Sequence, residues 1–119
     1  MPLELLTRIS VLIPFPATYV QFLLVDQIIT NFEQTFGGIT YSDNIIIPTF
    51  QGQWYDRATK RTDYDQHTLV WSDARIPISD AVLQDYLDRL KQQTQFDFNQ
   101  KIVWITLHEV HRVTTHDPP

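Results

Sequence analysis

Hydrophobic and polar residues alternate in the first strand-like segment of the chain, residues 5–13. One set of alternate positions holds Thr7, Ile9, Val11 and Ile13, and the other holds Leu6, Arg8, Ser10 and Leu12. Successive side chains of a strand point to opposite faces, so the pattern predicts a half-buried strand. Pro14 and Pro16 follow, and proline cannot donate to a strand ladder, so we expect the strand to end there.

Two later segments carry hydrophobic residues at helical spacing. The first runs from Thr18, which suits an N-cap, to Phe36, and Gly37 follows as a residue that tolerates a left-handed C-cap. The second begins after Ser79 or Asp80 and ends near residue 95. The sequence therefore predicts two amphipathic helices, one in each half of the chain.

Between the helices lie four short segments rich in strand-forming residues: 39–41, 45–47, 49–55 and 62–71. The polar loop 56–61 separates the last two, which predicts a β-hairpin with a loop of several residues. We expect residues 72–78, which include Pro77, to be a linker.

The last strand is predicted at residues 101–113. Its odd positions are Val103, Ile105, Leu107, Glu109 and His111, and its even positions are Ile102, Trp104, Thr106, His108 and Val110. Both sets begin apolar and end polar, so both faces of the first half should be covered. We expect the odd set to face the helices and the even set to face a second layer or a second subunit. Phe96 and Phe98, just before the strand, are expected to pack back against the core.

The predicted order of elements, β-α-β-β-α-β, resembles the ferredoxin-like α/β plait. That resemblance implies an α+β two-layer sandwich, with a four-stranded antiparallel sheet in the order 4-1-3-2 and two helices on one face. It covers residues 1–119 as one domain, with 114–119 as a flexible tail. The fold implies no function, because it hosts many. Three segments, GGIT (37–40), GQWY (52–55) and FNQKIVWI (98–105), resemble those of a small uncharacterised prokaryotic family, which implies no active site.

Composition narrows the class of protein. The chain of 119 residues is 43% hydrophobic and 19% charged, in the globular range, and it has no cysteine for a disulfide or a thiolate. The net charge of −5 opposes nucleic-acid binding, and the basic cluster at Arg57, Lys60 and Arg61 is small and flanked by aspartates. Prolines interrupt the apolar run 9–25, so we expect no membrane span, no targeting signal and a cytoplasmic protein.

Two clusters of titratable residues suggest chemistry. His108 and His111 would point to opposite faces of a strand, so they cannot share a metal ion there, whereas Glu109 and His111 share a face. That pair could be an acid/base pair, although an ion pair at a strand end is favoured. The second cluster, Asp63, Asp65 and His67, alternates along one predicted strand face. A charged hairpin arm is favoured for it over a divalent-metal site, and we expect no metal and no cofactor.

The face of the sheet opposite the helices is the predicted ligand or interface surface. It should hold Arg8, Ser10, Leu12, Trp104, Thr106 and His108. Aromatic residues and arginine are common in interfaces, so we expect a homo-oligomer, with a dimer favoured, or a small-molecule ligand between sheet and partner. The alternative is a small dimeric enzyme of the plait type, in which Arg8 holds an anion and His108 acts as acid or base. The sequence leaves open whether the protein is an enzyme and which face Trp54 and Trp71 occupy.

Overall fold

The computed structural model of the chain describes residues 3–41, 50–100 and 102–114, and the side chains of Phe50, Gln51, Gly52 and Asp65 lie outside this description. In chain order, the elements are β1 (Leu3–Pro14), α1 (Tyr19–Phe36), β2 (Thr40–Tyr41), β3 (Phe50–Asp56), β4 (Arg61–Ala74), α2 (Ala81–Asp97) and β5 (Trp104–Val113). The predicted strand at 45–47 and residues 115–119 of the predicted tail lie outside the described residues.

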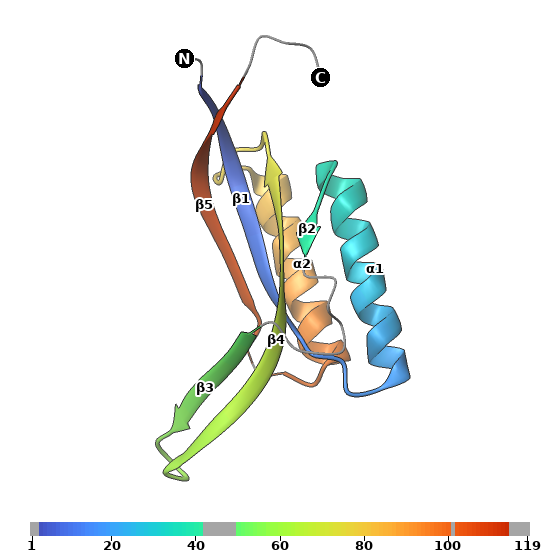
Figure 1. The fold of residues 1–119 in the computed structure, drawn as a ribbon, viewed down its shortest axis with the longest axis vertical. Coiled ribbons are helices and arrows are strands. Elements are labelled where there is room, and N and C mark those ends of the chain that lie inside the picture. Colours follow the sequence, from blue (N-terminus) through green and yellow to red (C-terminus); the bar gives the residue numbers. More distant parts are fainter. Residues whose placement is uncertain (1–2, 42–49, 101, 115–119) are drawn as a thin grey trace.

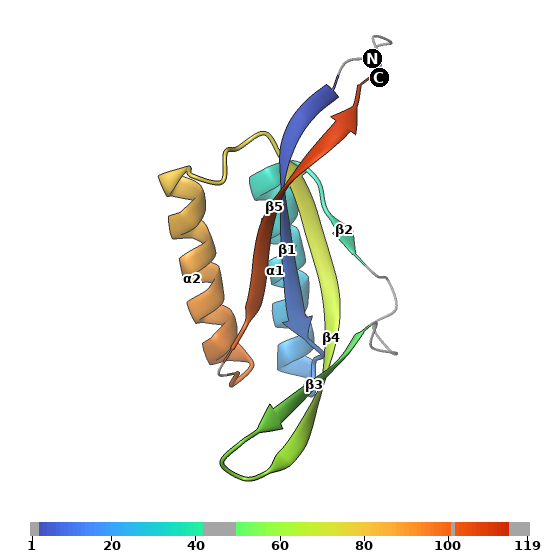
Figure 2. The same cartoon turned by 90° about the vertical axis from the view of Figure 1, so that its left-hand side faces the viewer.

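All strand pairs in the sheet are antiparallel. The path across it is β2-β4-β1-β5, and β3 also pairs with β4. Both helices cover the same face of the sheet, as Figures 1 and 2 show together. The α+β class and the two helices on an antiparallel sheet are thus confirmed. The order differs from the predicted 4-1-3-2, because β2 and β3 stand where one second strand was expected.

Local sequence signals define the ends of the helices. The Thr18 side chain accepts a hydrogen bond from the Gln21 backbone N–H (3.1 Å), and Gly37 ends α1 with a φ of 86°. Asp80 caps α2 by accepting from the Leu83 N–H (2.9 Å), which decides between the two predicted caps. The helix runs to Asp97, two residues beyond the predicted end.

The core lies between the sheet and the two helices. It contains fully buried residues from both layers, among them Ile9, Val11 and Ile13 of β1, Val70 of β4 and Phe32 of α1. Val103 is buried, and Ile105 and Leu107 pack against the same cluster. The predicted orientation of the first and last strands toward the helices is therefore confirmed.

Two predictions about the ends of elements are wrong. Residues 72–74 are not a linker, because β4 continues to Ala74 with Ser72 and Ala74 buried. Ser72 Oγ donates to the Gly38 carbonyl (2.5 Å), so the buried hydroxyl is satisfied and the polar residue does not end the strand. Phe96 is 83% exposed while Phe98 is buried, because α2 runs past residue 95 and turns Phe96 outward.

Strand β4 is shared between two parts of the sheet. Its second half pairs with β1 as far as the Pro14–His67 pair, and the Phe15 N–H donates once more, to the Gln66 carbonyl (2.8 Å). Its first half pairs with β3. Proline at the end of β1 stops that ladder, so the β3–β4 hairpin projects beyond the helices (Figure 1).

Neither helix among the described residues is both long and apolar enough to cross a membrane.

Candidate functional site

The sheet face opposite the helices, which we call the open face, brings the predicted surface residues into three rows. Each row takes one residue from β5, one from β1 and one from β4: His108–Arg8–Asp73, Thr106–Ser10–Trp71 and Trp104–Leu12–Leu69. All six residues predicted for this surface are therefore neighbours in space. Trp71 also lies on the open face, which the sequence left undecided.

One of these rows is entirely apolar. Trp104, Leu12 and Leu69 lie side by side across three strands, and Trp71 is in the next row. Trp104 remains 41% exposed, while Leu12, Leu69 and Trp71 are half-buried. Single exposed hydrophobic residues are common on protein surfaces, but a contiguous cluster of them marks an interaction site.

Arg8 is held by two neighbours on the open face. Its Nε and Nη2 donate to the two Asp73 carboxylate oxygens at 2.8 and 3.0 Å, and its guanidinium carbon lies 5.7 Å from the Trp71 ring centroid. The Arg8 hydrogen bonds lower the pKa of Asp73, and the carboxylate raises the pKa of Arg8. The bidentate pair occupies the donors that an anion would use. An anion that bound to Arg8, as predicted, would therefore have to compete with the Asp73 carboxylate.

His108 lies beside this pair, directly across from Arg8 in the β1–β5 ladder. Its side chain is exposed. An acid or base needs a pocket that holds the substrate and limits water. The enzyme alternative built on His108 and Arg8 stays a prediction.

A cavity of about 460 Å³ lies at the end of the open face where the β3–β4 hairpin meets the start of β5. Trp54 and Trp104 line it and stack nearly parallel, with ring centroids 5.5 Å apart and an interplanar angle of 11°. Asp63, directly across from Trp54 in the hairpin, lines the same cavity, as does Tyr64. The lining contains no lysine or arginine among the described residues. Its chemistry suits an aromatic or cationic group and disfavours an anion.

The predicted metal ligands do not form a described site. Asp63 is exposed and His67 is buried, and the side chain of Asp65 lies outside the described residues. Within the described part, no group of three or more His, Asp or Glu side chains is arranged to hold a metal ion. The divalent-metal alternative at this strand stays a prediction.

Strand geometry separates the histidines of β5 as expected. His108 pairs with Arg8 and His111 with Leu5 in one regular ladder, so the two imidazoles lie on opposite faces. Glu109 and His111 share a face and are both exposed. The expected ion pair between them is not among the ion pairs of the described residues.

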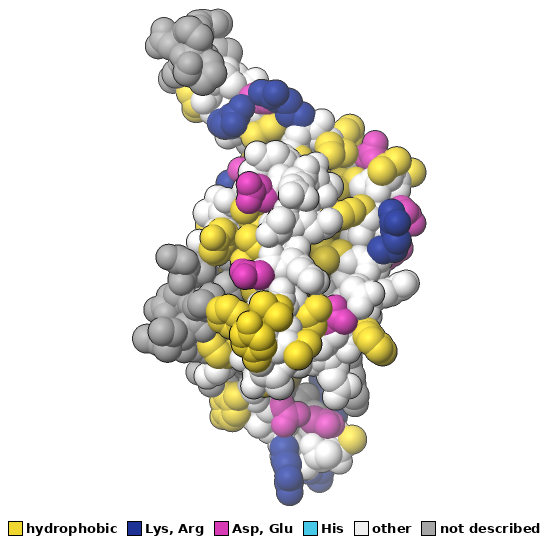
Figure 3. Space-filling view, turned by 90° about the vertical axis from the view of Figure 1, so that its right-hand side faces the viewer, with side chains coloured by type: hydrophobic (Ala, Val, Ile, Leu, Met, Phe, Trp, Pro, Cys, Tyr) yellow, Lys and Arg dark blue, Asp and Glu magenta, His cyan; other side chains and the backbone are white. Residues whose placement is uncertain are grey.

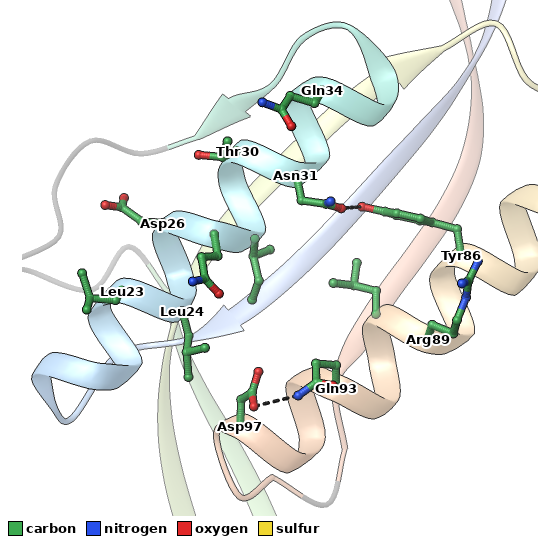
Figure 4. A pocket seen from close by; sticks show the side chains of 13 residues that line it. Leu23, Leu24, Asp26, Thr30, Asn31, Gln34, Tyr86, Arg89, Gln93 and Asp97 are labelled. Carbon is green, nitrogen blue, oxygen red and sulfur yellow. Dashed lines mark hydrogen bonds between the residues drawn. The ribbon is translucent and has the colours of Figure 1, made fainter.

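A second hollow lies on the other side of the molecule, between α1 and α2. It has a volume of about 860 Å³ and is crossed by a hydrogen bond from the Tyr86 hydroxyl to Asn31 (Figure 4). Burial raises the pKa of the Tyr86 hydroxyl. Hydrophobic side chains gather over α1 nearby (Figure 3). Leu23 and Leu24 of that helix line the hollow. The hollow is a groove lined by side chains of both helices and was not predicted from the sequence.

The basic cluster lies at the tip of the β3–β4 hairpin. Arg57, Lys60 and Arg61 are exposed at the turn of the β3–β4 hairpin, where Asp56 accepts a hydrogen bond from the Ala58 N–H (2.9 Å). Figure 3 shows dark blue side chains at that tip, next to acidic ones. The cluster forms no extended basic surface, in keeping with the prediction that the protein does not bind nucleic acid, which stays a prediction.

Sequence reasoning missed two parts of the open face. Asp73 fell in the predicted linker, although it continues the alternation of His67, Leu69 and Trp71, and that signal could have placed it. The Trp54–Trp104 stack had no such signal, because it depends on how the hairpin curves toward β5.

Comparison of the chain with family models, curated proteins and solved structures found no match. The resemblance of the three short segments to a prokaryotic family therefore stays a prediction.

Proposed function

We propose that the protein is an interaction module that forms homo-oligomers through its open face. The observation that carries the proposal is the apolar row of Trp104, Leu12 and Leu69 with Trp71 beside it. Burying such a row against a second copy removes aromatic and aliphatic surface from water, which is the main driving force of association. The same proposal includes the fold: taken together as one second strand, β2 and β3 would make the sheet a ferredoxin-like plait.

The extent of the exposed surface supports an oligomer. The accessible area of the chain is 8551 Å², whereas a compact monomer of 14.0 kDa exposes about 6,700 Å². The excess is roughly 1,900 Å², and a standard interface buries about 800 Å² on each partner. The chain thus exposes enough additional surface for a stable contact.

Light scattering tests the proposal. The wild-type protein should have a mass that is a multiple of 14.0 kDa, and Trp104→Ala should halve it. Tyr19→Ala is the matched control, because Tyr19 is also an exposed aromatic residue but lies on α1, in the opposite layer. A wild-type monomer, or a Trp104→Ala variant with unchanged mass, would contradict an oligomer through the open face.

A small-ligand-binding role is the second candidate, favoured by the cavity beside the tryptophan stack. Three exposed aromatic rings, Trp54, Tyr64 and Trp104, and the Asp63 carboxylate offer cation–π and ionic contacts to an organic cation. Titration with tetramethylammonium chloride, followed by tryptophan fluorescence against a sodium chloride control, should saturate in the wild type. Asp63→Asn should weaken binding without changing the oligomeric mass. A response equal to that of sodium chloride would exclude this role.

A further inference from the structure

Strand β5 is a long edge strand with one side unpaired. It runs for ten residues and pairs only with β1 within the described part of the chain. Its ladder with β1 is regular from Leu3–Val113 to Leu12–Trp104, without a bulge. Natural edge strands are usually short or protected by proline, charged side chains or a bulge. Strand β5 is long and contains no proline and no lysine, and its charged residues, Glu109 and Arg112, both lie in its second half. Its free backbone N–H and C=O groups are therefore available to another strand.

The second half of β5 is the accessible part of this edge. Figure 2 shows that β1 and the end of β5 extend past both helices as a twisted ribbon. Val113 is 52% exposed, and Leu3 and Leu5 of the adjacent β1 are exposed as well. Another strand can thus approach the end of β5 where it lies past α1 and α2 (Figure 2).

A second copy of β5 is a suitable occupant, and symmetry restricts how it can pair. A two-fold axis perpendicular to the sheet keeps the helices of both copies on the same side. Two residues that lie opposite each other across the interface must then point to the same side of the joined sheet. Their positions in the chain therefore differ by an even number, and one residue lies on the axis, opposite its own copy. An axis at Glu109 would place two carboxylates opposite each other, and an axis at His108 would place Glu109 opposite Leu107. Both arrangements are unfavourable.

An axis at Val110 avoids both arrangements. Val110 faces its own copy once, and three pairs occur twice each: Glu109 with His111, His108 with Arg112, and Leu107 with Val113. Apolar residues meet at Val110 and at Leu107–Val113, where the exposed Val113 gains an apolar neighbour, and Glu109 meets the more basic His111. At the remaining pair, the charge of Arg112 is already offset by Glu4, which accepts from it at 2.6 Å. Glu109 and His111, which lack a partner among the ion pairs of the described residues, would each gain one.

We propose that two copies of the chain pair antiparallel through β5, with a two-fold axis at Val110, and form one continuous sheet. The proposal goes beyond the proposed function, because it concerns the edge of the sheet and not its open face. The two open faces would lie on the same side of the joined sheet. Each copy would then contribute an apolar row to one larger surface, and stacking of such surfaces would pair dimers into tetramers.

Cysteine crosslinking tests the register directly, because the chain has no cysteine of its own. Val110→Cys should form a disulfide-linked dimer under mild oxidation, since the two sulfurs would face each other across the axis. Thr106→Cys, on the same face of β5, is the matched control, because its two copies would lie roughly 27 Å apart. We expect a yield of crosslinked dimer about tenfold higher for Val110→Cys. Circular dichroism should show that both variants keep the wild-type spectrum.

Three results would contradict the pairing through β5 or its register. Equal or greater crosslinking of Thr106→Cys or His108→Cys would overturn the register, and absence of crosslinked dimer in all three would overturn the pairing. Adding Trp104→Ala to Val110→Cys separates the two interfaces, because Trp104 lies outside the paired segment. Retained crosslinking in that double variant would support the edge contact even if stacking of the open face had failed its own test. Loss of crosslinking there would overturn the edge contact as an independent interface.

Discussion

Glu4 lies between two arginines at the end of the β1–β5 ribbon. Its carboxylate accepts hydrogen bonds from Arg75 Nε and from Arg112 Nη2, the latter at 2.6 Å. These hydrogen bonds lower the pKa of Glu4 from 4.5 to about 2, with Arg75 the larger cause. One residue thus ties β1 to the end of β5 and to the segment after β4, so the ribbon depends on its charge.

The depressed pKa of Glu4 sets the direction of a pH effect. Because the folded pKa lies below the unfolded one, the stabilisation by Glu4 is complete above about pH 4.5 and is lost as the pH falls toward 2. A carboxyl titration by NMR should show a midpoint near 2 for Glu4, and the midpoint should rise in Arg75→Met. Glu4→Gln should remove this part of the acid dependence of unfolding. A wild-type midpoint near 4.5 would contradict the double contact.

At the scale of elements, the second helix depends on a single cap. Asp80 accepts from the Leu83 N–H at 2.9 Å, and α2 has no acidic residue in its first turn to supplement the cap. Replacing an N-cap aspartate by alanine removes a partner from an otherwise unsatisfied backbone donor. Helix α2 supplies Leu83 and Leu87 to the core, so weakening its start affects the whole layer.

Asp80→Ala should therefore lower the free energy of unfolding by about 0.5–2 kcal/mol. Ser79→Ala is the matched control, because Ser79 was the other predicted cap and the structure assigns the cap to its neighbour. Urea denaturation should show a lower midpoint for Asp80→Ala and an unchanged one for Ser79→Ala. An equal loss in both variants would mean that the cap is not specific to Asp80.

At the scale of the whole molecule, the chain is extended for its length. Its radius of gyration is 16.2 Å and its extents are 55 × 30 × 25 Å, whereas a compact domain of this size has a radius of about 13.5 Å. The β3–β4 hairpin and the β1–β5 ribbon project beyond the helices at opposite ends (Figure 1). Such arms have few neighbours within the chain, and contacts between copies would stabilise them.

The melting temperature should accordingly depend on protein concentration. Association stabilises the folded state by mass action, and we expect the wild-type melting temperature to rise by roughly 2–4 °C for each tenfold increase in concentration. Trp104→Ala should show a smaller dependence because it loses the contact through the open face. A wild-type melting temperature independent of concentration would contradict both proposed interfaces.

Much of the fold could be predicted because the signals are local. The orientation of β1 followed from the alternation of Ile9, Val11 and Ile13, and the start of α1 followed from Thr18. The end of β4 was missed because Ser72 and Asp73 are polar, and the sequence does not show that Gly38 satisfies the Ser72 hydroxyl. A polar residue looks like the end of a strand until its partner is known.

In the candidate site, too, some features follow from local signals in the sequence and others do not. The sequence by itself determined which residues share a face, because side-chain direction in a strand or helix depends on neighbours within a few positions. Only the tertiary structure decided which faces meet: Arg8 and Asp73 are 65 positions apart, and the curve of the hairpin brings Trp54 onto Trp104. Strand register depends on the turns and on which faces are buried together, and curvature depends on how the whole sheet packs against the helices, so the pattern of one strand alone does not fix them.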